Sequence, residues 1–387
     1  MVTPQDHSVL QFTSRGQKII LLRSRGLAPH LFPDPFDRTG ENILTMGSDL
    51  RSAFGFQTMH NLFISQYLGD QGNLESHYSY QKTLLHFIHL SISKPQHILI
   101  DKHPHYFVSL FGKELVEKQN ILISSIQHQK AHFGSVLAEN KLLNSKEMVL
   151  GFIWDDSGYE EDDQIWGGEV FLFERNQMTR VAHLEYFLQL PGDKMCQEPR
   201  LSALSLLNNF PWQEMIEKYF SPMEWTYFQR FLSQPAGLLT SSMFRLLDVI
   251  SAILDICIYN SYDGEVTLKL EARARNATEL SKKFYAIPLI NNRLDFCPLL
   301  SGIMEDMLRL ENTDPIARKE FLSWVDMVEK VALHFNVDMI AFSGSVLQSA
   351  LLNTMLSGNL ANIFTLYFQK QLSPNDENIG FGQIACL

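Results

Sequence analysis

The same order of strand-like and helix-like segments occurs twice in this chain, and this duplication limits the fold more than any other feature of the sequence. Short apolar runs at 42–47, 52–57 and 62–67 are separated by turn residues, which predicts a three-stranded antiparallel meander. Another three strand-like runs occupy 148–187, and helical segments follow both sets. We therefore expect an α/β protein with two copies of one topology, each a mixed sheet with flanking helices.

The individual segments divide the chain into three parts. Residues 1–38 contain a strand at 17–22 followed by a Pro-rich linker, so we place a boundary near residue 38. We expect a first lobe at 39–147 and a second lobe at 148–387, with a strand–turn–helix unit at 338–353. Further elements predicted in the first lobe are a helix at 74–93, a strand at 96–101, a helix from about residue 105 and a strand at 121–126.

The overall composition excludes several classes of function. The 387 residues include 45% hydrophobic side chains, which is ample for a buried core. A net charge of −11 argues against general binding to nucleic acid or to an anionic membrane surface. The four Cys form no CxxC pair, the N-terminus lacks the features of a signal peptide, and no apolar run reaches the roughly 18 residues of a membrane span. We expect a cytoplasmic protein that binds neither nucleic acid nor membrane.

Two histidines four residues apart, His128 and His132, are the strongest local sign of a binding site. No Gly or Pro separates them, and the surrounding residues favour a helix. Residues i and i+4 of a helix lie on one face, so both imidazoles can reach one metal ion. In a chain with 13 His such a spacing also arises by chance, so the pair needs further support.

Three other positions have both a functional and a purely structural interpretation. Asp155 closes a predicted strand, where a carboxylate can meet a ligand or can cap a turn. The turn at Ser343 and Gly344 can present backbone N–H groups to a phosphate, or can serve conformation alone. Asp376 lies in a turn-rich segment and by itself reads as an exposed loop residue. The sequence contains no G-x-S-x-G, P-loop or H-E-x-x-H motif, so no nucleophile can be assigned from a motif.

Nine short segments spread over nearly the whole chain form a specific signature. They are R-S-R-G-L-A-P at 23–29, M-G-S-D-L-R-S-A-F at 46–54, S-Q-Y-L-G-D at 65–70, D-K-H-P-H-Y at 101–106, H-Q-K-A-H at 128–132, W-D-D-S-G-Y-(x)₆-W-G-G-E at 154–169, S-S-M-F-R-L-L-D at 241–248, S-Y-D-G-E at 261–265 and F-S-G-S-V-L-Q-S at 342–349. In this order they resemble the C-terminal carbamoyltransferase region of HypF, the [NiFe]-hydrogenase maturation protein. TobZ-type O-carbamoyltransferases and the tRNA threonylcarbamoyl-transferase family are more distantly similar.

This resemblance implies a fold and a set of site residues. The fold is the two-lobed ASKHA type, in which each lobe is a mixed sheet with flanking helices and a nucleotide lies in the cleft. The implied cofactor is one divalent metal, Fe or Zn. No catalytic residue is assigned apart from the metal centre. The metal ligands implied are His128, His132, Asp155 and Asp376, and the nucleotide-binding residues implied are Ser157, Gly158, Asp248, Glu265, Ser343 and Gly344.

The resemblance also implies a reaction and its partners. The carbamoyl group of an ATP-derived carbamoyl-adenylate passes to an acceptor, which in HypF is the C-terminal Cys thiol of HypE, and AMP departs. Residues 1–38 resemble the tail of a YrdC-like domain, so we expect a separate YrdC-like source of carbamoyl-adenylate. Two alternatives remain at this point: O-carbamoylation of a small-molecule hydroxyl, and a non-catalytic protein that binds a metal or a partner on a degenerate carbamoyltransferase fold.

The chain departs from the family pattern at four positions. Phe244 stands where the pattern has Gly, and a Phe would crowd a nucleotide that approaches the backbone. Ser345 and Ser349 replace a Gly and an Asn. Asp156 replaces the Gly after Asp155 and adds a negative charge beside the expected phosphate position. Because all four metal-ligand positions match, we expect metal binding to persist and the ligand to have changed or to bind more weakly.

Overall fold

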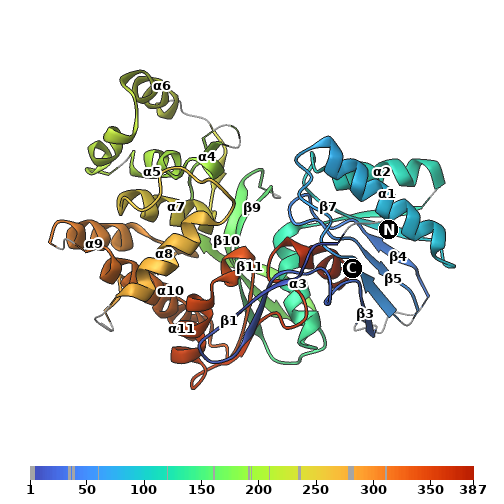
Figure 1. Ribbon diagram of the computed structural model, residues 1–387. Coiled ribbons are helices and arrows are strands. Elements are labelled where there is room, and N and C mark those ends of the chain that lie inside the picture. Colours follow the sequence, from blue (N-terminus) through green and yellow to red (C-terminus); the bar gives the residue numbers. More distant parts are fainter. Residues whose placement is uncertain are drawn as a thin grey trace.

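Two lobes lie side by side in the computed structural model, with helix α3 (His128–Glu139) between them (Figure 1). The described residues are 5–33, 36, 40–59, 61–119, 121–159, 162–190, 192, 194–208, 210–233, 237–277, 283–309 and 312–387. Each lobe contains a mixed sheet with flanking helices, which confirms the predicted α/β class and the ASKHA architecture. The predicted boundary at residue 38 falls outside the described residues.

The first sheet combines an antiparallel meander with two parallel strands. Its strands lie in the order β3-β6-β5-β4-β7-β8. Strands β4, β5 and β6 pair antiparallel in the predicted meander, and β7 and β8 add to β4 in parallel. Helices α1 (Leu74–Leu90) and α2 (Phe107–Gln119) connect β6 to β7 and β7 to β8. The strand bounds are His30–Pro33 (β3), Ile43–Thr45 (β4), Gly55–Gln57 (β5), Asn61–Ile64 (β6), His97–Asp101 (β7) and Leu122–Ile126 (β8).

The second sheet repeats this frame. Strands β9, β10 and β11 form an antiparallel meander, β16 pairs in parallel with β9, and β17 pairs in parallel with β16. Short strands β12 to β15 extend it near β10 and β11. The predicted duplication of one topology is therefore present. The bounds are Val149–Tyr159 (β9), Ile165–Glu174 (β10), Gln177–Leu184 (β11), Phe187–Leu188 (β12), Leu239–Thr240 (β13), Leu289–Ile290 (β14), Arg293–Leu294 (β15), Met339–Ser343 (β16) and Thr365–Tyr367 (β17).

A helical insertion enlarges the second lobe between β11 and β16. Its helices and the second sheet enclose the largest apolar core, in which Trp154 of β9 and Trp324 of α10 are almost fully buried. The bounds are Lys194–Gln197 (α4), Pro199–Leu207 (α5), Gln213–Tyr219 (η1), Pro222–Leu232 (α6), Met243–Ile253 (α7), Glu265–Asn276 (α8), Cys297–Met307 (α9) and Asp314–Phe335 (α10). After β16 come η2 (Ser345–Gln348) and α11 (Ala350–Leu360), which complete the predicted strand–turn–helix unit.

The C-terminal helix α12 (Ile379–Ala385) packs tightly against α3. A Cβ atom at Gly382 would lie 1.8 Å from the carbonyl oxygen of Ala131, and one at Gly134 would lie 2.9 Å from Cβ of Ala385. Both positions therefore need Gly, because a side chain would push the two helices apart. This close crossing holds the end of the chain beside the two histidines of α3.

The N-terminal segment differs from its prediction. The strand at 17–22 is present as β2 (Lys18–Leu22), but it pairs with β1 (Val9–Phe12), and β3 forms the edge of the first sheet; neither β1 nor β3 was predicted. β1 is only four residues long and mostly exposed, and β3 ends in Pro33, a residue that an edge strand tolerates. Short edge strands leave a weak pattern, which explains both omissions.

Candidate metal centre between the lobes

Two histidines of the first lobe form one half of the site. Helix α3 begins at His128, two residues after β8 ends, and His132 lies one turn further on. The predicted helix is confirmed, and the two rings lie 5.0 Å apart between their centroids. The His128 and His132 side chains are 1% and 0% exposed, so both imidazoles face the interior.

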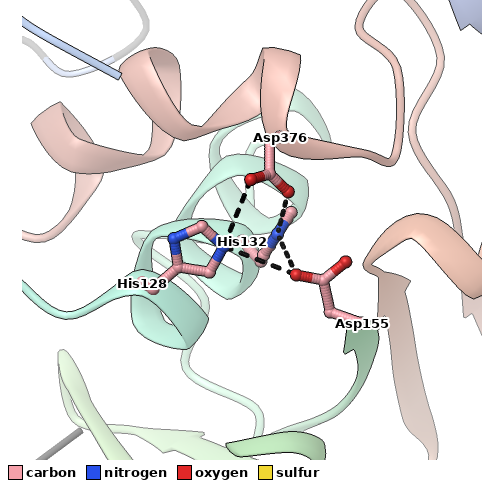
Figure 2. Close-up of side chains that lie close together, drawn as sticks. All are labelled: His128, His132, Asp155 and Asp376. Carbon is pink, nitrogen blue, oxygen red and sulfur yellow. Dashed lines mark hydrogen bonds and ion pairs between the residues drawn. The ribbon is translucent and has the colours of Figure 1, made fainter. Parts of the chain in front are cut away.

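Two carboxylates from the second lobe form the other half of the site (Figure 2). Asp155 lies in β9, and Asp376 begins η3 (Asp376–Asn378) directly before α12. Oδ2 of Asp155 lies 3.4 Å from Nε2 of His128 and 3.2 Å from Nε2 of His132. Asp376 places Oδ2 at 3.7 Å from Nε2 of His128 and Oδ1 at 3.5 Å from Nε2 of His132.

The donor set fits a divalent metal ion. One ligand atom from each of His128, His132, Asp155 and Asp376 lies within 4.8 Å of the others, and all four residues are buried. Nε2 of His128 faces the Asp155 and Asp376 carboxylates at 3.4 and 3.7 Å, so once it has lost its proton its lone pair points to where an ion would lie. Two imidazoles and two carboxylates are a donor set that suits Fe(II) or Zn(II).

The electrostatics of this cluster also fit a cation. Burial acts to lower the pKa of His128, but the Asp376 and Asp101 carboxylates outweigh it and raise that pKa well above its ordinary value. Burial acts to raise the pKa of Asp155, but the charges of His132 and His128 hold it well below its usual range. Without a cation, the imidazoles balance the carboxylates by holding protons. A divalent ion supplies that charge directly and releases the protons on binding.

Neighbouring groups orient three of the four side chains. Asp101, the last residue of β7, accepts a hydrogen bond at 2.7 Å from Nδ1 of His128, which directs Nε2 into the cluster. The Ser48 hydroxyl donates to Oδ2 of Asp376 at 2.8 Å, and the Ser345 backbone N–H donates to Oδ1 of Asp155 at 2.9 Å. A carboxylate behind a ligating histidine is the common arrangement at protein metal sites.

The predicted nucleotide turn at Ser343 and Gly344 lies beside Asp155. Gly344 has φ of +100°, and a Cβ there would lie 2.2 Å from the Trp154 carbonyl oxygen, so only Gly allows the turn to approach β9 this closely. Ser343 is fully buried, and its hydroxyl accepts hydrogen bonds from the amides of Gln369 and Asn378. The backbone of this turn therefore helps to hold Asp155 in place.

The other predicted nucleotide residues differ in whether their contacts connect them to the cluster. Asp248 of α7 is buried and bound to Arg245, which in turn contacts Asp156 beside Asp155. Glu265 begins α8 and accepts hydrogen bonds from Ser261, so the described contacts do not join it to the metal cluster. Gly158 is buried in β9, and the Ser157 side chain falls outside the described part of the structure.

The four departures from the family pattern have distinct structural consequences. Phe244 is 8% exposed and belongs to the apolar core of the second lobe. Ser349 caps α11 and donates to Glu271 at 2.5 Å. Ser345 contributes its backbone N–H to Asp155, a contact that does not depend on its side chain. Asp156 forms an ion pair with Arg245.

Sequence reasoning did not assign three residues that contact the site. Asp101 and Ser48 lie within quoted segments of the signature, but no local pattern connects either residue to a histidine or carboxylate far away in the chain. Arg245 lies on the buried side of α7, and its charge partners come from β9 and from its own helix. The available signal in the sequence was the position of Arg245 three residues before Asp248, a predicted nucleotide-binding residue.

Fold and site together define a class of protein: a two-lobed ASKHA protein with a buried cluster of two His and two Asp between its lobes. A family model described as "Carbamoyltransferase, Kae1-like Domain, second subdomain" matches residues 151–383, and one described as "HypF Kae1-like domain" matches residues 38–139. The chain belongs to this HypF-type carbamoyltransferase family.

Relatives match nearly all of this chain, and the chain spans about half the length of the curated relatives. Carbamoyltransferase HypF of Synechocystis sp. is 28% identical over 99% of this chain and 52% of its own length. The probable carbamoyltransferase HypF of Methanocaldococcus jannaschii is 28% identical over 94% of this chain and 48% of its own.

Solved structures of HypF have the same fold. A crystal structure of full-length HypF in its phosphate- and nucleotide-bound form matches 100% of this chain and 51% of its own, with a TM-score of 0.88 and 24% identity. The crystal structure of HypF from T. kodakarensis matches 98% and 52%, with a TM-score of 0.87 and 25% identity. Among the described residues, no helix is both long and apolar enough to cross a membrane.

Proposed function

We propose that this chain transfers a carbamoyl group from carbamoyl-adenylate to an acceptor thiol, that of the C-terminal Cys of a HypE-type protein, in [NiFe]-hydrogenase maturation. The observation that carries this proposal is the convergence of His128, His132, Asp155 and Asp376 from both lobes on one point, in a chain of the carbamoyltransferase family. The activity, the metal, the adenylate and the HypE-type partner are all parts of the proposal.

The chain's own residues would bind and orient the reactants. His128 and His132 would hold Fe or Zn with Asp155 and Asp376, and Asp101 would keep the proton of His128 on Nδ1 so that Nε2 faces the centre. When bound, the ion supplies a Lewis acid that polarises a carbonyl or phosphoryl oxygen.

The transfer itself needs no nucleophile from this chain. The acceptor thiolate forms a bond to the carbamoyl carbon, the bond from that carbon to the phosphate oxygen breaks, and AMP leaves with the electron pair. This agrees with the lack of a nucleophile motif in the sequence. Burial of the four ligand residues would keep bulk water away from a carbamoyl carbon bound beside them and so would protect the anhydride from hydrolysis.

The direct test combines the protein, a YrdC-like enzyme that makes carbamoyl-adenylate, and a HypE-type acceptor. Mass spectrometry should show one carbamoyl group on the acceptor's C-terminal Cys. A His128→Ala variant should lose this product, and a His89→Ala variant should keep it, because His89 is an exposed residue of α1 far along the chain from the cluster. No carbamoylated acceptor with metal-loaded protein would contradict the proposal.

A second candidate is a metal- or partner-binding protein without transferase activity. Two observations favour it: Phe244 in the core of the second lobe and the Asp156 carboxylate on Arg245, both at positions where the family pattern has Gly.

Offering a panel of small hydroxyl compounds in the same assay tests the O-carbamoyl alternative. Bound metal with no AMP binding at millimolar concentration would favour the non-catalytic candidate.

A further inference from the structure

The buried guanidinium of Arg245 is held by two carboxylates. One of them belongs to Asp156, which follows the cluster residue Asp155 in the chain. Nη2 of Arg245 lies 3.2 Å from Oδ1 of Asp156, and its Nε lies 3.0 Å from Oδ2 of Asp248. The Arg245 side chain is 5% exposed and also interacts with the Cys196 side chain, while its Nη1 has no partner with hydrogen-bond geometry among the described residues. A buried guanidinium with an unused N–H group is a ready receptor for an anionic oxygen.

Asp156 is the more accessible partner of this guanidinium. Its side chain is 19% exposed, whereas that of Asp248 is 1% exposed, so Asp156 covers Arg245 on the side nearer to solvent. Asp248 belongs to the same helix as Arg245, three residues further on, and its contact is built into α7. Asp156 comes from another element, β9, and can leave Arg245 without unfolding the helix.

A bulge in the second sheet brings Asp156 to this position. The pairing of β9 with β10 shifts register between Trp166 and Gly168, opposite Asp155 and Asp156. A Cβ at Gly167 would lie 2.7 Å from the carbonyl oxygens of both Asp residues, and 3.0 Å from Cα of Ser242. Bulges often redirect side chains at functional sites. Here the bulge lies between the metal cluster and the start of α7.

The start of α7 adds a second preference for negative charge. Ser242 caps the helix by accepting a hydrogen bond from the Arg245 backbone N–H, and the first turn contains no acidic side chain. The N-terminus of an 11-residue helix carries partial positive charge and attracts anions. Arg245 lies in this first turn, so the guanidinium and the helix terminus are close to the same bulge.

We propose that Arg245 is the receptor for a phosphoryl oxygen of the ligand, and that Asp156 is a built-in substitute for that oxygen which the ligand has to displace. The position of Asp156 is a Gly in the family pattern, where no carboxylate would compete. The choice of a phosphate ester as ligand rests on the proposed function, in which the donor is an adenylate. This chain is therefore self-blocked at its anion position and selects for ligands that bind strongly enough to expel Asp156.

The charges around Arg245 predict how much the Asp156 carboxylate weakens the binding of a phosphate. Near pH 8, where both carboxylates are ionised, Asp156 and Asp248 together outweigh the single charge of Arg245, so an arriving phosphate meets an uncompensated carboxylate. Removing Asp156 leaves a neutral Arg245–Asp248 pair with one open side. Two like charges about 4 Å apart at an effective dielectric constant near 20 repel strongly enough to change affinity by more than tenfold.

The test is calorimetric titration of the metal-loaded protein with inorganic phosphate and with AMP. Asp156→Ala should bind phosphate and AMP at least about tenfold more tightly than the wild type. Asp156→Asn, which removes the charge but keeps the side-chain volume, should show a smaller gain. Asp263→Asn is the matched control: Asp263 is 72% exposed, contributes negative charge to the same neighbourhood and leaves Arg245 covered. It should bind like the wild type.

A second variant checks the receptor itself. Adding Arg245→Gln to Asp156→Ala should abolish the gain, while metal content and melting temperature, measured on every variant, establish that the centre is intact. A gain with AMP alone would support the inference with a phosphate ester as the ligand. Equal affinities of the wild type and a folded, metal-loaded Asp156→Ala for both probes would overturn it. Because binding is measured without any acceptor, a gain with no carbamoyl transfer would contradict the proposed function and leave this inference standing.

Discussion

The two lobes share one frame but contribute different chemistry. In each, a three-stranded meander is followed by two parallel strands, β7 and β8 in the first lobe and β16 and β17 in the second. A helix follows the fifth strand in both, and these two helices, α3 and α12, cross at the centre of the molecule. The first lobe brings histidines to this crossing and the second brings carboxylates.

The connection between the meander and the parallel strands differs most. The first lobe uses the single helix α1, whereas the second lobe uses the insertion that contains α4 to α10. Arg245 and Asp248 belong to this insertion, and so do the predicted nucleotide residue Glu265 and the unusual Phe244. The shared frame therefore builds the cluster of two His and two Asp, and the insertion provides the groups that would select the ligand.

Removing a ligand from either lobe should have the largest effect. His128→Ala from the first lobe and Asp376→Ala from the second should each abolish stoichiometric binding of Fe or Zn, because each deletes one of four donors. Elemental analysis after dialysis is the measurement, with His89→Ala as the control. If only the histidine variant lost metal, the second lobe would not share the site as proposed.

The insertion of the second lobe buries a carboxyl group, that of Glu320 in α10, which should lower the free energy of unfolding at high pH. Its carboxyl is fully buried, and burial raises its pKa from 4.5 to about 8 against the opposing hydrogen bond from Nε1 of Trp324. The folded state therefore keeps a proton that the unfolded chain releases, so the free energy of unfolding should fall as pH rises from about 4.5 to 8. Glu320→Gln should remove this dependence and be more stable than the wild type at pH 9 by roughly 4 kcal/mol. Urea unfolding across this pH range is the measurement, and parallel curves for both proteins would show that Glu320 does not keep its proton.

The helix crossing that joins the two lobes should be sensitive to one methyl group. Gly382→Ala places Cβ against the Ala131 carbonyl, so we expect a loss of about 3 kcal/mol in unfolding free energy, together with weaker metal binding. Gly358→Ala in α11 is the matched control, because its Cβ would meet only the Arg15 side chain at 3.4 Å. That change should be neutral or stabilise by up to about 1 kcal/mol. Similar losses in both variants would assign the effect to something other than the crossing.

The smallest effect on metal binding should come from Asp101, whose carboxylate accepts the hydrogen bond from Nδ1 of His128. Asp101 ends β7, and the equivalent strand of the second lobe, β16, ends in Ser343, which has no comparable contact with a metal ligand. Asp101→Asn should weaken metal binding by about 10- to 100-fold without abolishing it. Competition with a chelator gives the affinity, and the exposed Asp255→Asn serves as the control. An unchanged affinity would mean that the orientation of His128 does not depend on Asp101.

Much of the fold could be predicted because periodic patterns report local structure. The meander strands, the helix at 74–93 and the helix with His128 and His132 all follow from the spacing of apolar residues. Strands β1 and β3 did not, since a short edge strand buries little and needs no apolar alternation. The short strands β12 to β15 likewise exist through pairing with distant partners.

The site residues also differ in whether a local pattern predicts them. His128 and His132 are visible in the sequence because a helix brings i and i+4 together, whatever the rest of the chain does. Asp376 reads as an exposed loop residue, yet it is 5% exposed and faces both rings. In the sequence, only the resemblance to the family connects Asp376 to the two histidines.

The sequence alone determined the two-lobed plan, the histidine pair and the family, because each depends on residues near one another in the chain or on the order of motifs. The resemblance already named Asp155 and Asp376, but only the tertiary structure brings their carboxylates to the histidines, places Asp101 behind His128 and sets Asp156 against Arg245. These contacts join residues far apart in the chain. They depend on how β9, α7 and the α3–α12 crossing pack against one another, which local patterns do not encode.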